Sequence, residues 1–166
     1  MKQPGSRDIL VSEAIALGDD DRVRAALEEL CAATGMGFAA VARVTEDRWI
    51  AAQVLDRIEF GLEPGSELEV KTTICDEIRQ SGQEVFIDHV DGDLAWRRHP
   101  VPILYGFQSY VSLPLFRADG SFYGTLCAID PEPRQITGSE TLATMRALAV
   151  QLSTVLSAEN SATSPG

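Results

Sequence analysis

Three cysteines and two histidines are the side chains of this sequence that are best suited to chemistry. Cys31, Cys75 and Cys127 lie far apart, with no CxxC pair and no histidine spaced to complete a zinc site. This spacing indicates neither a disulfide framework nor a structural metal, so we expect reduced thiols. No residue is therefore assigned a catalytic or metal-binding role.

Cys75 has the position that most favours reactivity. It lies at the start of a predicted helix, where the positive end of the helix dipole lowers a thiol pKa and favours a redox or electrophile sensor. The alternative is a small buried apolar residue, which is the commonest fate of a free cysteine. Cys127 lies between Leu126 and Ala128 in a predicted strand, and it fits this second interpretation better.

The irregular segment 88–105 is a second place for chemistry. It contains the motif WRRHP at 96–100, in which Trp96, His99 and two arginines could hold an anion or a planar ligand. The alternative is a solvated loop whose Trp96 packs on the edge of a sheet. Long irregular loops in compact domains are usually functional or mobile, so a ligand is first expected here.

The elements that must position these side chains centre on residues 105–133. Two runs of aromatic and aliphatic residues flank Asp119-Gly120, which is a strong hairpin signal. Both faces of each run are largely apolar, so we expect this hairpin near the middle of a sheet that is covered on both sides. Alternation along the second strand places on one face Tyr123, Thr125, Cys127 and Ile129.

Helical spacing, capping residues and alternation predict the remaining elements. We expect helices at 9–17, 21–34, 72–82 and 137–158, and strands at 38–44, 49–55 and 84–87. Residues 59–70 are predicted to form a connection. The polar segments 1–8 and 159–166 are expected to be flexible ends, which leaves 9–158 as one domain.

Composition limits the classes of partner. The 166 residues are 45% hydrophobic, which is enough for a core. With 14 basic and 25 acidic residues the net charge is -11, which disfavours contact with nucleic acid. The N-terminal segment lacks the continuous apolar run of a signal peptide, and no stretch approaches the roughly 20 apolar residues needed to cross a bilayer. We therefore expect a cytoplasmic protein with neither a nucleic acid nor a membrane partner.

Several motifs together resemble GAF domains, which are ligand-sensing or dimerising modules of bacterial signalling proteins. They are SYVSLPL at 109–115, DG at 119–120 and GTLCAID at 124–130, supported upstream by IC at 74–75, Gly82 and VFID at 85–88. The resemblance spans roughly residues 20–157, and it is closest to the GAF modules that precede bacterial histidine kinases. It implies an α+β fold with a central antiparallel sheet of five or six strands. The terminal helices would cover one face, and a pocket would lie on the other beneath loops and short helices at 72–106.

The implied pocket assembles the candidate site residues. Tyr105, Phe107, Ser109, Tyr110 and Thr125 would line the sheet face or its rim and suit a small planar or apolar molecule. The alternative for each is simple packing. The full set of candidates for ligand binding is Cys75, Trp96, His99, Tyr105, Phe107, Ser109, Tyr110, Thr125 and Cys127. No cofactor is assigned.

The resemblance implies a non-catalytic sensory or regulatory module. Such a module binds a small molecule, or pairs two subunits through helices 21–34 and 138–158. It then acts on an output domain or protein. One alternative is the family branch that reduces free methionine-(R)-sulfoxide, since Cys75 falls at the first of its three pocket cysteines, although no cysteine lies between Val85 and Leu126. Another is a bilin photoreceptor, although segment 97–110 lacks the usual attachment cysteine. The cyclic-nucleotide signature of the family is not found.

Overall fold

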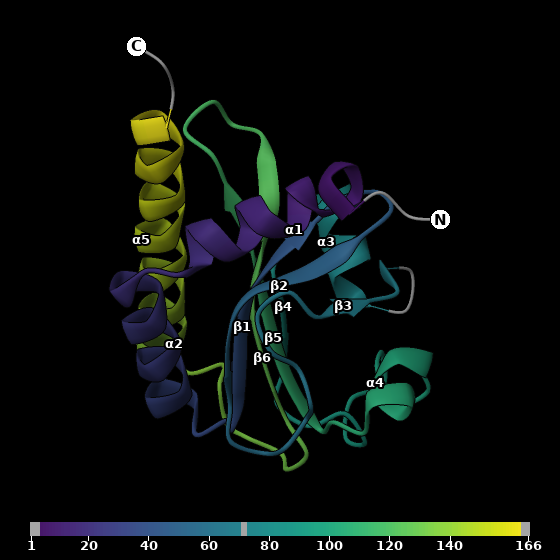
Figure 1. The fold of residues 1–166 in the computed structure, drawn as a ribbon. Coiled ribbons are helices and arrows are strands. Elements are labelled where there is room, and N and C mark those ends of the chain that lie inside the picture. The colour runs from purple at the N-terminus through teal and green to yellow at the C-terminus, as the bar shows by residue number, and fades with distance from the viewer. Residues whose placement is uncertain (1–3, 71–72, 164–166) are drawn as a thin grey trace.

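The computed structural model describes residues 4–70 and 73–163, which form a six-stranded antiparallel sheet and five helices (Figure 1). The strands are β1 (Phe38–Val44), β2 (Trp49–Asp56), β3 (Glu67–Leu68), β4 (Val85–Ile87), β5 (Ser109–Phe116) and β6 (Phe122–Asp130). The helices are α1 (Pro4–Gly18), α2 (Asp21–Thr34), α3 (Ile74–Ser81), α4 (Pro100–Tyr105) and α5 (Ser139–Thr163). This architecture confirms the predicted α+β class.

The order of strands in the sheet is β3-β2-β1-β6-β5-β4. The hairpin of β5 and β6 therefore lies against the hairpin of β1 and β2, and β6 occupies a central position, as the two apolar faces of its sequence predict. Helices α1, α2 and α5 cover one face, with α2 and α5 side by side, whereas α3 and α4 lie on the other (Figure 1). The predicted division of helices between the two faces is confirmed.

Each face of the sheet buries its own core. On the helix side, the core joins α2, α5 and the sheet through residues such as Leu27, Met145 and Leu126. On the other side, which we call the pocket face, the core is richer in aromatic rings, including Trp49 and Tyr110. The pocket face therefore holds most of the side chains that the sequence indicated for ligand binding.

Helix α2 shows how local signals set the element boundaries. The Asp20 carboxylate caps the helix by accepting the N–H of Arg22 at 2.8 Å. The helix ends at Gly35, whose φ of 76° lies in the left-handed region that glycine adopts without strain. Both ends agree with the prediction.

Helix α3 begins less regularly. Thr73 is its N-cap residue, but the hydroxyl donates to the Val70 carbonyl at 2.6 Å rather than to the helix. Thr72, where the predicted helix begins, lies outside the described residues. The helix therefore starts at Ile74, which places Cys75 in its first turn.

A β-bulge changes the faces of two residues in β6. Leu115 pairs with Gly124, whereas Phe116 pairs with Phe122, so Tyr123 is the extra residue. Its ring lies in the helix-side core, and Phe122 packs toward the pocket face. The face predicted for Tyr123 from strict alternation was wrong because alternation holds only where pairing is regular.

Several boundaries differ from those predicted. Helix α1 begins at Pro4 and α5 continues to Thr163, so both enter the segments 1–8 and 159–166 that were expected to be flexible ends. The remainder of those two segments lies outside the described residues. Strand β3 falls within the predicted connection at 59–70, and α4 falls within the segment expected to be irregular. The limits of the single domain stay a prediction.

Candidate functional site

A small cavity lies on the pocket face, between the sheet and helices α3 and α4. Its volume is about 40 Å³, well below the roughly 300–1,000 Å³ of pockets that hold drug-sized molecules. Its walls are mostly aromatic and aliphatic and consist of Phe38, Trp49, Phe60, Leu62, Leu68, Thr73, Ile74, Cys75, Val101, Tyr105, Phe107, Tyr110, Cys127 and Ile129. The side chains themselves therefore occupy most of the space beneath α3 and α4.

Two sets of ring contacts account for this filling. Phe60 lies between Phe38 and Tyr105, with ring centroids 5.0 and 5.9 Å apart. Phe107 stacks on Tyr110 with centroids 5.1 Å apart. Such contacts are favourable but individually weak, about 0.5–1.5 kcal/mol beyond area burial.

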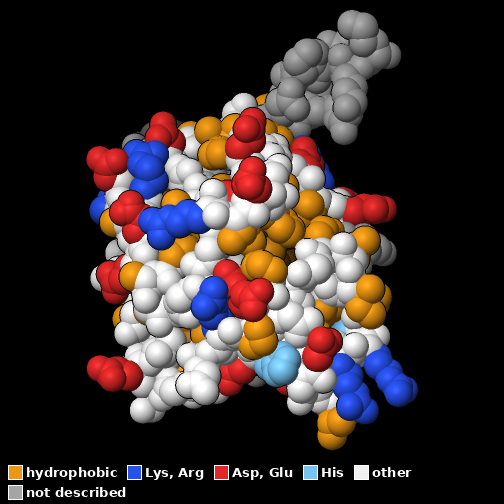
Figure 2. Space-filling view, turned by 90° about the horizontal axis from the view of Figure 1, so that it is seen from below, with side chains coloured by type: hydrophobic (Ala, Val, Ile, Leu, Met, Phe, Trp, Pro, Cys, Tyr) orange, Lys and Arg blue, Asp and Glu red, His pale blue; other side chains and the backbone are white. Residues whose placement is uncertain are grey.

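A wider hollow opens on the surface beside this cavity, next to the C-terminal end of α4. Its volume is about 430 Å³. The space-filling view from below shows apolar side chains at the surface among charged ones (Figure 2). Six residues line both spaces, namely Phe60, Leu62, Leu68, Tyr105, Phe107 and Ile129. These six residues, which we call the partition, form the wall that the cavity and the surface hollow share.

A buried cluster of thiols and hydroxyls lies at the base of the cavity. The Cys75 sulfur is 3.2 Å from Thr125 Oγ1, 3.6 Å from the Tyr110 hydroxyl and 3.8 Å from Ser112 Oγ. The Cys127 thiol donates to the Ala40 carbonyl at 3.7 Å. Helix α3 thus places the Cys75 thiol in contact with the hydroxyl groups of β5 and β6.

The surroundings change the acidity of these groups in opposite directions. The neighbouring Cys127 thiol and the hydroxyls of Thr125 and Tyr110 lower the pKa of Cys75, against the effect of burial. The same contact with Cys75, together with burial, raises the pKa of Cys127. Burial raises the pKa of Tyr110 as well. The Trp49 Nε1–H, which has no hydrogen-bond partner among the described residues, is near enough to favour the Cys75 thiolate.

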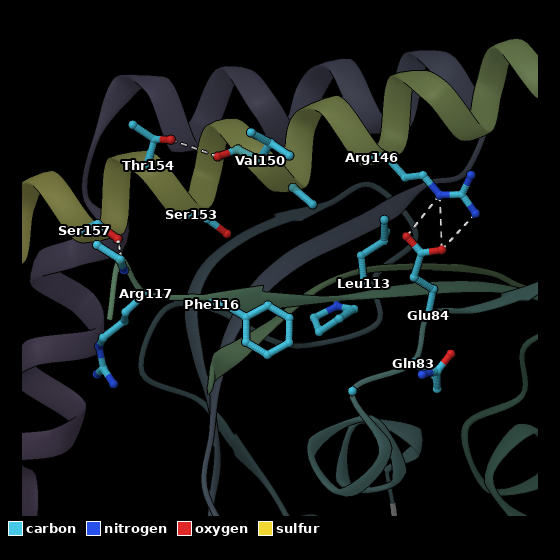
Figure 3. Close-up of a pocket in the computed structure, with 14 residues that line it drawn as sticks. Gln83, Glu84, Leu113, Phe116, Arg117, Arg146, Val150, Ser153, Thr154 and Ser157 are labelled. Carbon is cyan, nitrogen blue, oxygen red and sulfur yellow. Dashed lines mark hydrogen bonds and ion pairs between the residues drawn. The ribbon is translucent and has the colours of Figure 1, made fainter. Parts of the chain in front are cut away.

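A larger hollow, of about 780 Å³, lies on the helix side between α5 and β5 (Figure 3). The Glu84–Arg146 ion pair, 2.9 Å long, stands at one end, and Arg117 points away from the opening (Figure 3). The Thr154 hydroxyl is already bonded within α5 at 3.1 Å. The described residues that line this hollow include no thiol or imidazole. The thiols and their hydroxyl neighbours therefore lie on the pocket face, although the hollow on the helix side is larger.

A family model described as GAF domain matches residues 20–156. The chain belongs to the GAF domain family. No match was found among curated proteins.

Solved GAF domains have the same fold at low sequence identity. The GAF domain of an Acinetobacter phosphoenolpyruvate-protein phosphotransferase is 12% identical, with a TM-score of 0.66 over 99% of this chain and 100% of that one. The GAF-B domain of DevS from Mycobacterium smegmatis is 20% identical, with a TM-score of 0.62 over 85% and 94% of the two chains. The GAF domain of a two-component sensor histidine kinase from Bacillus halodurans is 15% identical, with a TM-score of 0.63 over 86% and 95%. At these identities the likeness shows the fold alone.

Most of the predicted site residues meet on the pocket face of this GAF domain. Cys75, Tyr105, Phe107, Tyr110 and Cys127 line the cavity. Thr125 lies at its base, in contact with Cys75. The structure therefore brings these predicted residues together from α3, α4, β5 and β6.

Trp96, His99 and Ser109 lie outside the cavity lining. The His99 ring caps α4 by accepting the Val101 N–H at 3.2 Å, and its other nitrogen is 3.2 Å from Glu77 of α3. Trp96 packs against this ring, with centroids 4.8 Å apart. The two residues therefore join α3 to α4.

Ser109 points away from the pocket. Its hydroxyl donates to the Glu132 carbonyl at 2.8 Å, and the side chain is fully buried. Alternation along β5 places Ser109 on the side opposite Tyr110. It therefore fixes the end of the strand.

Sequence reasoning missed Phe60 and the other partition residues that precede α3. Phe60, Leu62 and Leu68 belong to the segment that was predicted to be only a connection. Their signal was apolar side chains in an otherwise polar loop, which a surface loop does not need.

Among the described residues, no helix is long and apolar enough to cross a membrane. The same residues contain no group of three or more histidine, cysteine or carboxylate side chains that could hold a metal ion.

Proposed function

We propose that this GAF domain is a non-catalytic sensory module whose pocket binds a small, largely apolar and planar molecule. The observation that carries the proposal is the partition between the buried cavity and the surface hollow. The hollow of about 430 Å³ already has the size of a ligand pocket, whereas the cavity of about 40 Å³ does not. Displacing the partition side chains joins the two spaces above the thiol and hydroxyl cluster.

The partition is built to move more readily than the rest of the core. Tyr105 ends α4, which has only six residues and carries two exposed apolar neighbours, Ile103 at 69% and Leu104 at 61% exposure. Short helices contribute little stability of their own. A ligand that displaces Tyr105 therefore shifts α4, and the His99–Glu77 contact carries the shift to α3. Such a population shift is the change that an output domain reads.

The chemistry of the lining supports binding rather than catalysis. Among the described residues that line the cavity, none is a histidine, lysine, arginine or carboxylate. The imidazole, amine and carboxyl groups that most often act as general acid or base are thus lacking among these lining residues. The reductase alternative lacks two of its three pocket cysteines, since no cysteine lies between Val85 and Leu126, and Cys31 lies in the helix-side core. Covalent bilin attachment near His99 is not favoured either, since His99 caps α4.

A titration with indole, a planar apolar probe, tests the proposal. Indole should raise the melting temperature of the wild type under reducing conditions and should perturb the Phe60 and Tyr105 ring signals in NMR spectra. Phe107→Trp enlarges one of the partition side chains and fills the cavity beside Tyr110, so it should weaken binding at least tenfold. Phe116→Ala, an exposed residue beyond the pocket face, is the matched control and should bind as the wild type does. Equal affinity of all three proteins, or no binding by a panel of planar probes, would refute the proposal.

The same proposal includes a homodimer through the terminal helices, cytoplasmic location and coupling to a bacterial output such as a histidine kinase. A groove between α2 and α5 supports the dimer, because its lining combines apolar side chains such as Val150, which is 67% exposed, with the charged Arg22 and Glu29. Light scattering should give the mass of a dimer, and Val150→Glu should give a monomer, while Ile103→Glu should not. A wild-type monomer at every concentration would rule the dimer out.

A further inference from the structure

Two buried cysteines from different elements meet at the base of the pocket. Cys75 comes from the first turn of α3, and Cys127 comes from the middle of β6. Ser112 lies directly opposite Cys127 in the sheet, and Thr125 is two residues away on the same face of β6. The Cys75 sulfur lies 3.8 Å from Ser112 Oγ and 3.2 Å from Thr125 Oγ1, so it stands over the strand beside Cys127. The packing of α3 on β5 and β6 thus places both thiols in the lining of one cavity.

The two thiols are unlike each other. Polar neighbours of Cys75, first of all the Cys127 thiol and then the Thr125 hydroxyl, favour its thiolate and lower its pKa. Cys127 keeps its proton, because the neighbouring Cys75 and burial raise its pKa. A thiolate beside a protonated thiol is the arrangement that thiol oxidation uses, since the thiolate is the nucleophile.

The cavity sets the size of the oxidant. Cys75 is 2% exposed and Cys127 is 6% exposed, and both line the cavity of about 40 Å³. A cavity holds a water molecule once roughly 10–15 Å³ is open to a water-sized probe, so a space of about 40 Å³ admits a molecule with two heavy atoms. Larger oxidants, such as glutathione disulfide, are excluded while the partition is in place. Hydrogen peroxide has the matching size and carries no charge.

We propose that hydrogen peroxide oxidises Cys75 and Cys127 to an intramolecular disulfide that joins α3 to β6. The Cys75 thiolate attacks one peroxide oxygen, the O–O bond breaks, and the departing hydroxide takes a proton to become water. The Cys75 sulfenic acid is then attacked by the Cys127 sulfur, whose proton leaves with the sulfenic oxygen as a second water. The two sulfurs together lose two electrons, and one peroxide is reduced to two waters. The disulfide would fix α3, which covers the pocket, to β6 at its base.

The third cysteine provides a matched control. Cys31 is also buried, at 3% exposure, but it belongs to the helix-side core, on the other face of the sheet. Burial raises its pKa. It therefore shares the burial of the pair but has neither the thiol partner nor the thiolate character.

The test treats the full chain with hydrogen peroxide, removes the excess with catalase, and labels free thiols with a maleimide after denaturation. Wild type and Cys31→Ser should each lose two labelled thiols and two hydrogen atoms in mass, and dithiothreitol should restore both. Cys127→Ser should instead gain a dimedone-trapped sulfenic acid on Cys75. Cys75→Ser should keep both of its remaining thiols. Circular dichroism identifies any variant that does not fold.

Peptide mapping of the oxidised wild type decides the question without any variant. A peptide pair that joins Cys75 to Cys127 supports the proposal. Retention of all three thiols, a bond to Cys31, or added oxygen without loss of two hydrogens overturns it. The reaction does not depend on ligand binding, and the indole titration is performed under reducing conditions, so the two proposals fail independently.

Discussion

Replacement of Gly124 by alanine tests how closely the two central strands pack. A Cβ at this position would lie 1.8 Å from the Ala42 carbonyl oxygen and 3.0 Å from the Val44 backbone nitrogen. For ordinary contact, which starts at 3.4 Å, the backbone of β1 would have to move by roughly 1.6 Å, the difference between 3.4 and 1.8 Å. Both strands are buried on both faces, so neither can move without opening the core.

The magnitude follows from two opposing effects. Overpacking a core costs about 1–3 kcal/mol, and the upper end applies here because the contact is with backbone atoms. Alanine also restricts the unfolded chain, which offsets about 0.4–1 kcal/mol. We therefore expect a net loss of about 2 kcal/mol in the free energy of unfolding. At about 2–4 °C per kcal/mol, the melting temperature should fall by roughly 4–8 °C.

Urea unfolding followed by circular dichroism measures this loss. The midpoint should fall while the slope m stays unchanged, since the surface exposed on unfolding is the same. Gly138→Ala is the control, because a Cβ there meets no atom within 4 Å. The control should be neutral or slightly stabilising. A Gly124→Ala protein that unfolds at or above the wild-type midpoint would show that the strands are not packed in this way.

Two further predictions concern single polar groups. Tyr123→Phe removes a buried hydroxyl with no partner among the described residues and keeps the ring beneath Arg43, whose guanidinium carbon is 5.1 Å from the ring centroid. Urea unfolding should show a gain of up to about 1 kcal/mol in the free energy of unfolding. A loss of that size would show that the hydroxyl has a partner. The Arg22 guanidinium holds the pKa of Asp20 at about 2, below the unfolded value of about 4, so its contribution is complete above pH 4 and is lost as the pH falls through 2. Asp20→Asn should keep the cap and flatten this part of the stability profile, whereas Asp20→Ala should cost about 1 kcal/mol at neutral pH. An unchanged profile in Asp20→Asn would exclude this role.

The elements that the sequence predicts well are those set by neighbouring residues. Asp20 and Gly35 mark the ends of α2 because a cap and a left-handed residue act within one turn. Asp119-Gly120 marks the turn of the central hairpin for the same reason. Sheet coverage on both sides could be predicted too, since it follows from apolar residues on both faces of each strand.

The parts that could not be predicted depend on contacts between distant residues. The bulge that turns Tyr123 toward the helices exists only once β5 and β6 have paired. Phe60 reaches the pocket because its loop folds back beside Phe38, and no local pattern records this approach. The volume of the cavity depends on the packing of every ring around it. His99 was predicted as a ligand candidate from its type, whereas its position makes it a helix cap.

The pairing of β1 with β6 has a consequence for synthesis of the chain. Phe38 lies opposite Ile129, so the centre of the sheet closes only after the intervening strands and helices have been made. Closing so long a loop is slow, because chain entropy is lost before the new contacts form. Until β6 leaves the ribosome, the first hairpin keeps an open edge and an uncovered apolar face, which is where a nascent chain aggregates. Chaperone binding during translation should therefore concentrate on residues 38–56 and end once residue 130 has emerged.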